Sequence, residues 1–200
     1  ADVVVAVSDA VGRQIVDCLG VDPDRVVIVS IGAETVASVP SVPAGPPTVL
    51  YPAATHPHKN HRLLVEAFDR VAARHPDVRL VLTGGRGAAE ADVARAIATA
   101  EHAGRIDRTG RVPAADLARH LADADVVAFP STYEGFGIPV LEAMAAGVAV
   151  LVADGTPAAD LVQGCDAVVG ASDPAVWAEA LDRLLADRDH RTALAARVLA

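Results

Sequence analysis

Residues 126–147 read VVAFPSTYEGFGIPVLEAMAAG, and this stretch decides the fold. An apolar run ends at Pro130, a loop with two glycines follows, and Pro139 and Gly147 bracket the next apolar segment. Proline suits the first turn of a helix, and glycine suits the position just past its end. The stretch therefore predicts a buried strand, a loop at its carboxyl end and then a helix, which is the repeating unit of α/β proteins.

The same alternation of strand and helix extends along the chain in both directions. Short Val-rich runs predict strands at residues 2–7, 26–30, 48–51, 78–83, 105–109, 126–130, 148–152 and 167–169. Helical patterns lie between them at residues 10–19, 63–74, 90–102, 114–122, 138–146, 158–163, 174–186 and from 191 onward. The strand runs are continuously apolar, as expected for strands that helices cover on both faces. The sequence thus predicts an α/β fold with a doubly wound, Rossmann-like parallel sheet.

A proline-rich segment divides the chain into two parts. Residues 39–47 hold four prolines and a glycine, which predicts a semi-rigid linker. A β-α-β piece at residues 1–38 precedes the linker, and a complete α/β domain at residues 48–200 follows it. Two strands cannot bury both of their faces alone, so we expect the first piece to pack on other structure or to self-associate. The chain begins without an initiating Met and directly before a predicted strand, which favours a fragment or a processed product.

Composition excludes several classes of protein. Hydrophobic residues make up 52% of the 200 residues and charged residues 22%, which excludes a disordered chain. The net charge is −9 and no basic stripe with interleaved aromatic residues is present, so nucleic acid is not an expected partner. Cys18 and Cys165 form no CxxC motif, and we expect reduced, half-buried thiols in a cytoplasmic protein. No apolar run reaches the length of a membrane span.

The loop after the strand predicted at residues 48–51 carries the first candidate site. Lys59 precedes the next helix, where unpaired amides and the helix dipole favour an anion, so an ammonium there indicates a phosphate site. The alternative is a capped helix start with a solvated lysine. His56, His58 and His61 lie in the same loop, but no cysteine is nearby and a fourth ligand is missing, so we expect no metal.

Three other segments carry weaker signals. Gly84 lies in the segment TGGRG at residues 83–87, where glycine lets the backbone approach a ligand closely, although a tight turn explains it equally well. Arg111 follows the next strand and would meet a phosphate or a base edge, or else lie on the surface as an ordinary arginine. Asp123 and Asp125 have the spacing of a metal-binding DxD motif. They precede their strand, away from the ligand edge, so we interpret Asp125 as a cap of the preceding loop.

The loop at residues 130–138 is the most informative. The amides of Gly137 and Ile138 begin the predicted helix without partners in it, so they would point into the crevice at the carboxyl edge of the sheet, ready for a diphosphate. Glu134 and Glu142 flank this anion site. A ribose diol would satisfy the Glu142 carboxylate, and the alternative is an exposed helix glutamate. For Glu134 the alternative is an ordinary loop acid.

This pattern resembles the donor-binding half of retaining GT-B glycosyltransferases, in particular glycosyltransferase family 4 (group 1). Residues 126–147 resemble the signature of that family, and Lys59 and Asn60 match a subgroup with a Pro-His-Lys-Asn-His sequence. The strands predicted before the linker resemble late strands of the amino-terminal domain. The resemblance covers nearly the whole chain and implies the C-terminal half of a GT-B fold, with a trailing remnant of the acceptor domain at residues 1–38.

The resemblance implies a role for each matching residue. Lys59 would neutralise the diphosphate of a nucleotide sugar and Glu134 would bind hydroxyls of the transferred sugar, which makes these two the candidate catalytic residues. Glu142 would bind the ribose. The other candidate donor-binding residues are Phe136, Gly137, Ile138, Arg111, Val112 and Gly84. Family members retain the anomeric configuration of the transferred hexosyl group and use no metal, so the implied small molecule is the nucleotide-diphosphate sugar as donor substrate, with no cofactor.

The sequence departs from the family pattern at several places. Ala53 stands where an arginine is common, which removes one partner of the phosphates, and Arg86, Arg111 and His58 are the candidates to replace it. Asp160 stands where a glutamate is usual. Most of the acceptor domain and the closing helix of the family are missing, so we expect these residues alone to turn over little, because positioning both substrates supplies much of the rate.

Two other functions stay open. A non-catalytic nucleotide-binding or assembly module with a GT-B-like fold is favoured by Ala53. An epimerase or a phosphorylase of the same layout is less well supported, because no lysine in a recognisable pyridoxal setting is found. As a transferase, the chain is expected to have as partners a nucleotide sugar, the acceptor domain, a second copy of itself and, for the full-length protein, a membrane surface touched peripherally.

Overall fold

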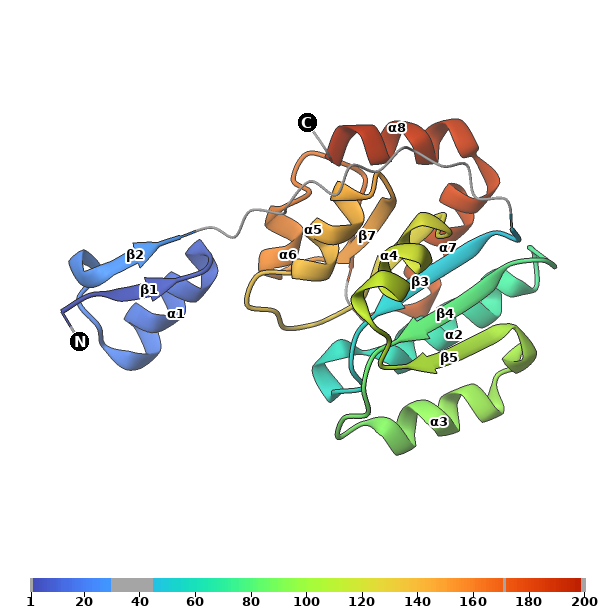
Figure 1. The fold of residues 1–200 in the computed structure, drawn as a ribbon, viewed down its shortest axis with the longest axis horizontal. Helices are drawn as coiled ribbons and strands as arrows, with labels where there is room; N and C mark the ends of the chain where they lie inside the picture. The colour runs from blue at the N-terminus through green and yellow to red at the C-terminus, as the bar shows by residue number, and fades with distance from the viewer. Residues whose placement is uncertain (1, 30–44, 171, 199–200) are drawn as a thin grey trace.

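The chain forms two parallel sheets, a small one at the amino terminus and a large one after the proline-rich segment (Figure 1). The computed structural model describes residues 2–29, 45–170 and 172–198. Residues 30–44 lie outside the described residues, and they include most of the predicted linker at 39–47 and the end of the strand predicted at 26–30. The domain boundaries at 38 and 48 therefore stay predictions.

The small sheet is a single β-α-β unit. Its elements are β1 (Val4–Ala6), α1 (Asp9–Leu19), η1 (Pro23–Arg25) and β2 (Val26–Ile28). Ser8 caps α1 by accepting a hydrogen bond from the Val11 amide at 3.2 Å. Gly12 lets α1 pack tightly on β2, because a Cβ there would lie only 2.6 Å from Ile28 Cδ1. The helix thus covers one face of the two strands.

Apolar side chains of the small sheet are exposed to solvent. They are Val3, Val5, Val27, Ile28 and Val29. The expectation that this unit leaves apolar surface uncovered is confirmed for the described residues, whereas self-association stays a prediction. Cys18, expected to be half-buried, is exposed, because it lies on the side of α1 that faces solvent, and Cys165 is partly buried. Both cysteines are free thiols.

The large sheet has six parallel strands in the order β5-β4-β3-β6-β7-β8. The strands are β3 (Thr48–Pro52), β4 (Arg79–Thr83), β5 (Ile106–Gly110), β6 (Val126–Phe129), β7 (Ala149–Ala153) and β8 (Val168–Val169). The helices are α2 (His61–Ala72), α3 (Glu90–Thr99), α4 (Ala114–Ala122), α5 (Ile138–Ala145), α6 (Pro157–Asp160), α7 (Pro174–Ala186) and α8 (Arg188–Val198), with short turns η2 (Pro57–Lys59) and η3 (Ala103–Arg105). The predicted doubly wound, Rossmann-like fold is confirmed.

The order of the strands places a switch point between β3 and β6. From β3 the chain winds outward through β4 to β5, and it then returns to the far side of β3 and winds through β6, β7 and β8. Right-handed crossovers then put α2 and α3 on one face and α4, α5 and α6 on the other, and α7 packs beside α2 (Figure 1). In such a sheet, ligands bind outside the carboxyl ends of the strands at the switch point.

The core of the large sheet is aliphatic, with four large aromatic side chains that are fully buried. These are Tyr51, Phe68, Phe129 and Trp177. The Trp177 indole donates a hydrogen bond to the Gly170 carbonyl at 2.9 Å, and the Tyr51 hydroxyl donates one to the Lys59 carbonyl at the switch point. Buried aromatic residues with a polar group need such partners, so these contacts fix the two rings in place.

The amino edge of the sheet shows what Asp125 does, and the interpretation as a cap of the preceding loop is wrong. The Asp125 carboxylate accepts from the Thr48 amide at 2.9 Å and pairs with the Arg191 guanidinium at 2.9 Å. The Asp125 amide in turn donates to the Thr48 carbonyl. Asp125 therefore joins the starts of β3 and β6 to α8, far along the strands from the carboxyl edge.

Candidate functional site

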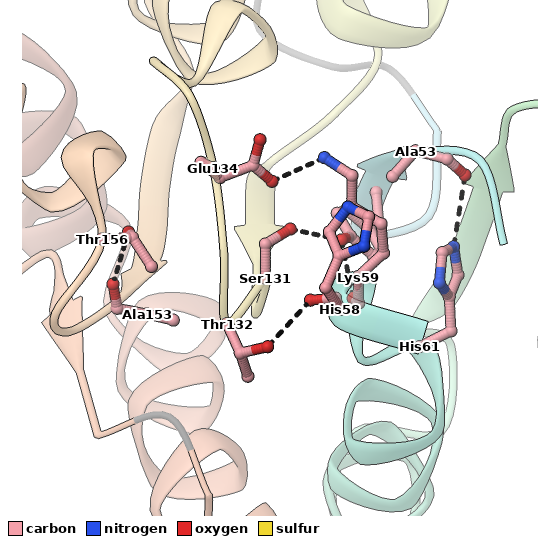
Figure 2. Close-up of polar contacts among 10 residues, drawn as sticks. Ala53, His58, Lys59, His61, Ser131, Thr132, Glu134, Ala153 and Thr156 are labelled. Atoms are coloured by element: carbon pink, nitrogen blue, oxygen red, sulfur yellow. Dashed lines mark hydrogen bonds and ion pairs between the residues drawn. The ribbon is translucent and has the colours of Figure 1, made fainter. Parts of the chain in front are cut away.

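The loops that follow β3 and β6 meet at the switch point and bring Lys59 to Glu134. The Lys59 ammonium donates to the Glu134 carboxylate at 2.5 Å (Figure 2). Only 17% of the lysine side chain and 10% of the glutamate side chain are exposed. Lys59 Nζ also lies 5.3 Å from the centre of the Phe129 ring. The two candidate catalytic residues therefore form one partly desolvated ion pair, where electrostatic interactions are stronger than in water.

The backbone beside Lys59 is held by residues of the β6 loop. The His58 carbonyl accepts from the Thr132 amide at 2.8 Å and from the Thr132 hydroxyl at 3.2 Å (Figure 2). The Tyr51 hydroxyl donates to the Lys59 carbonyl at 2.7 Å. Asn60, the next residue, has a φ of 52°, a left-handed conformation that is uncommon outside glycine. The loop that carries Lys59 is therefore tightly constrained.

The start of α5 supplies amides at the same edge of the sheet. Gly137 has a φ of 105°, and a Cβ there would lie 2.7 Å from the Ala158 Cβ, so only glycine fits. The amides of Phe136, Gly137 and Ile138 make no hydrogen bond within the described residues. Free amides at the start of a helix of eight residues suit an anion, as the sequence predicts. Their contact with a diphosphate stays a prediction.

Glu142 lies one turn into α5 and is exposed rather than buried. Neighbouring protein atoms partly desolvate its carboxyl and raise the pKa above the ordinary value, and within the described residues no hydrogen bond reaches that carboxylate. A carboxylate with free acceptor sites beside a ligand edge can take hydrogen bonds from a diol. The ribose contact of Glu142 stays a prediction.

The glycine loop after β4 packs against the loop after β3. Gly84 has a φ of 129°, and a Cβ there would overlap the Ala53 carbonyl. A Cβ at Gly87 would lie 2.6 Å from the Thr55 carbonyl oxygen. These glycines are therefore explained by close approach of protein backbone, and the donor contact predicted for Gly84 stays a prediction. Ala53 itself lies in this contact.

Three cations were predicted to replace the arginine that the family commonly has at the position of Ala53, and they lie in different places. Arg86 is highly exposed and its guanidinium is 3.9 Å from Glu90. Arg111 is exposed at the end of β5, two strands away from β3, and Val112 follows it. His58 lies next to Lys59, with its ring 6.2 Å from and edge-on to that of Tyr133. Of the three candidates, His58 is the one whose position in the loop is beside Lys59.

A second ion pair, between Arg108 and Glu90, holds the β3 loop and was not predicted from the sequence. Arg108 donates to both carboxylate oxygens of Glu90 at 2.6 and 2.9 Å, and the Thr55 hydroxyl donates to Glu90 at 2.8 Å. The hydrogen bonds from Arg108 lower the pKa of Glu90 to about 2. These contacts connect the loops after β3 and β4 to β5, and thus fix the β3 loop relative to the sheet.

His61 is a buried part of this framework. Its Nε2 lies 3.2 Å from the Ala53 carbonyl (Figure 2), and its Nδ1 is buried without a hydrogen-bond partner among the described residues. Burial lowers the pKa of His61 to about 4. No group of three or more His, Cys, Asp or Glu side chains that could hold a metal ion is found in the described part of the chain.

The low pKa of His61 predicts a pH dependence of stability. An unfolded histidine has a pKa of about 6.5, so between pH 4 and 6.5 the unfolded chain binds a proton that the folded chain does not. The contribution of His61 is therefore complete above pH 6.5 and is lost as the pH falls toward 4, by about 3 kcal/mol. Urea unfolding at pH 4.5, 5.5 and 7.5 measures the free energy of unfolding of wild type and His61→Gln. This free energy should rise less steeply with pH in the variant. A slope for His61→Gln equal to that of wild type would contradict the assignment.

The fold is a Rossmann-like domain with the Lys59–Glu134 ion pair at its switch point. The family model described as glycosyl transferases group 1 matches residues 34–198. A D-inositol 3-phosphate glycosyltransferase of Kineococcus radiotolerans is 32% identical over 98% of this chain and 52% of its own length. O-antigen chain mannosyltransferase B of Escherichia coli is 32% identical over 76% of this chain and 40% of its own length. The chain belongs to the group 1 glycosyl transferases.

Solved structures show the same fold. HepE of Anabaena in complex with UDP and glucose superposes with a TM-score of 0.87 at 21% identity, over 100% of this chain and 57% of that one. Sucrose-phosphate synthase of Thermosynechococcus elongatus gives a TM-score of 0.85 at 24% identity, over 100% and 53%. The chain spans about half the length of the curated relatives it matches first. In the described residues no helix is long and apolar enough to cross a membrane.

Proposed function

We propose that the chain is the donor-binding half of a retaining, metal-independent glycosyltransferase of family 4, which transfers a hexosyl group from a nucleotide-diphosphate sugar to an acceptor. The observation that carries this proposal is the Lys59–Glu134 ion pair at the switch point, at the same sheet edge as the free amides of α5. The relatives named above support the class of reaction. The complex of HepE with UDP and glucose supports this class of ligand for the fold.

The proposed chemistry follows from where charge develops. When the bond between the anomeric carbon and the diphosphate oxygen breaks, negative charge grows on the leaving diphosphate. Lys59 and the amides of Phe136, Gly137 and Ile138 would stabilise that charge, and fixed donors of this kind lower the barrier because they need no reorganisation. The acceptor hydroxyl would attack the anomeric carbon on the face from which the diphosphate leaves, and its proton would pass to the leaving diphosphate. Glu134 would orient the sugar through its hydroxyls.

The acceptor would bind to a separate domain, outside the large sheet. We propose that residues 1–38 trail from an acceptor domain and that the linker at 39–47 joins it to the donor domain at 48–200. Ser8 donates a hydrogen bond to the Gly135 carbonyl at 2.8 Å, which connects the small sheet to the loop that carries Glu134. Because both substrates must be positioned for transfer, we expect these 200 residues alone to bind donor and to turn over little.

A non-catalytic nucleotide-binding or assembly module is the second candidate, and the alanine at position 53 favours it. Such a module is expected to keep the fold and to bind nucleoside diphosphates only weakly or not at all. Binding therefore separates the two candidates.

Thermal stabilisation by nucleotide sugars tests the proposed function. We expect UDP-glucose, UDP-N-acetylglucosamine or GDP-mannose, at 100 times its Kd, to stabilise the fold by about 2.7 kcal/mol and to raise Tm by about 5–10 °C. Glu142→Ala should weaken binding about 10- to 100-fold, because hydrogen bonds from the ribose to a carboxylate are lost.

The matched control is Glu179→Ala, which removes an exposed glutamate from α7. This variant should keep the wild-type response to each nucleotide sugar. Full stabilisation of Glu142→Ala would contradict the ribose contact. No response of the wild type at millimolar ligand would favour the non-catalytic module.

A further inference from the structure

A buried chain of hydrogen bonds runs from Ser131 through Tyr51 to the backbone of Lys59. We propose that Tyr51 and Ser131 are positioning residues that fix the Lys59 backbone, so that its ammonium is aimed at the diphosphate. This inference rests on the proposed function and assigns new residues to the same site. Neither side chain was singled out by the sequence analysis.

The direction of each hydrogen bond follows from the chemistry. The Lys59 carbonyl can only accept, so the Tyr51 hydroxyl donates its one proton to it, at 2.7 Å. The Ser131 hydroxyl, 2.9 Å from the Tyr51 oxygen, must then be the donor to Tyr51. Tyr51 is 0% exposed and Ser131 1% exposed. Burial raises the pKa of Tyr51, so its hydroxyl stays protonated and remains a donor.

The chain of bonds joins the two strands that flank the switch point. Tyr51 lies near the carboxyl end of β3, and Ser131 lies just after β6. The Lys59 carbonyl is therefore tied, through one tyrosine, to the loop that carries Glu134. Thr132 of the β6 loop holds the His58 carbonyl, so two consecutive carbonyls of η2 are fixed, one by the β6 loop and one by Tyr51 of β3.

The hydrogen bonds that η2 makes within itself join residues that are close in sequence, so contacts from other elements help to fix it. Within η2 and its neighbours, the Lys59 amide donates to the His56 carbonyl at 3.0 Å and the Asn60 amide to the Pro57 carbonyl at 3.1 Å. Asn60 adopts a left-handed conformation, which costs free energy for a residue other than glycine. Such a conformation persists only where surrounding structure holds it. The Tyr51 bond is one of the contacts that hold it.

The ring of Tyr51 packs in the core, and the experiment must separate this packing from the hydrogen bond of the hydroxyl. The Tyr51 ring lies edge-on to Phe129 at 5.7 Å between centroids and 4.7 Å from the His61 ring. Tyr51→Phe keeps both contacts and removes only the hydroxyl. Any effect of this variant on anion binding therefore reports the bond to the Lys59 carbonyl rather than the filling of the core.

The experiment is a double-mutant cycle read by titration calorimetry, with UDP and GDP as probes. Tyr51→Phe should weaken binding of the diphosphate about tenfold when Lys59 is present, the size of one lost hydrogen bond. In a chain that also carries Lys59→Met, the same change should alter binding less than about twofold, because Tyr51 acts through the ammonium. Ser131→Ala should have a smaller effect in the same direction. Thr48→Val, at the other end of β3, should have none.

Amide hydrogen exchange of the same variants tests the positioning without any ligand. The amides of Lys59 and Asn60 should exchange at least about fivefold faster in Tyr51→Phe than in wild type or Thr48→Val. Unchanged exchange, or equal effects of Tyr51→Phe with and without Lys59, would overturn the inference. Faster exchange in a chain that binds neither UDP nor GDP would uphold the positioning and contradict the proposed function.

Discussion

Replacing Lys59 with methionine is expected to weaken the binding of UDP or GDP by about 100-fold, the largest effect on ligand affinity of any single change proposed for this chain. Methionine has nearly the length of lysine and no charge, so the change removes the ammonium with little loss of packing. A charge-assisted hydrogen bond is worth about 1.5–3 kcal/mol, and here the side chain is only 17% exposed. Titration calorimetry with each nucleoside diphosphate measures the effect.

Glu134→Gln is the informative companion of Lys59→Met. Glu134 is the carboxylate that pairs with Lys59, so its removal frees the ammonium and relieves repulsion of the diphosphate. We expect Glu134→Gln to bind UDP more tightly than wild type, whereas Lys59→Met binds it more weakly. A sugar nucleotide should gain less from Glu134→Gln than UDP does, because the amide replaces a charged acceptor of sugar hydroxyls.

Arg62→Met is the control for the loss of a positive charge near this loop. Arg62 lies one residue into α2, 74% exposed, and pairs with Glu66 at 3.4 Å on the surface. Its removal should change diphosphate affinity less than about twofold, because exposed pairs are screened by solvent. If Lys59→Met loses no more affinity than Arg62→Met, Lys59 is not the phosphate partner.

The large sheet and the position of the site were predictable from the sequence for a physical reason. Continuous apolar runs separated by helical periods specify a parallel sheet, and loops at the carboxyl ends of its strands must then share one edge. Lys59 and Glu134 are 75 residues apart and follow different strands. The shared edge of the carboxyl ends is enough to bring them together. Glycine and proline at the ends of α5 fixed that helix within a residue.

The contacts between side chains could not be predicted in the same way. They depend on which strands are neighbours and in which register, so the bond between Tyr51 and Ser131, 80 residues apart, leaves no local pattern. One signal was present: a tyrosine inside an aliphatic buried strand must find a partner for its hydroxyl. The contact of Gly84 with Ala53 was missed for the same reason, since a glycine-rich loop looks alike whether it approaches a ligand or another loop.

Gly84→Ala is expected to lower the free energy of unfolding by about 3 kcal/mol or more, because two penalties add at one atom. A φ of 129° is strained for any residue with a Cβ, and the new methyl group would overlap the Ala53 carbonyl and lie 2.8 Å from the Ala54 amide nitrogen. These neighbours are backbone, so they cannot rotate away. The β3 loop must shift, and the bond between His61 and the Ala53 carbonyl shifts with it.

Gly85→Ala separates this packing effect from a general intolerance of the loop to side chains. A Cβ at Gly85 meets no heavy atom within 4 Å, so the free energy of unfolding should change by less than about 0.5 kcal/mol. Urea unfolding of both variants measures the difference. Diphosphate affinity should fall in Gly84→Ala and not in Gly85→Ala, because the displaced β3 loop carries Lys59. Equal stabilities would contradict the close approach of the two loops, and a fall in affinity shared by both variants would indicate direct contact of the glycine loop with the ligand.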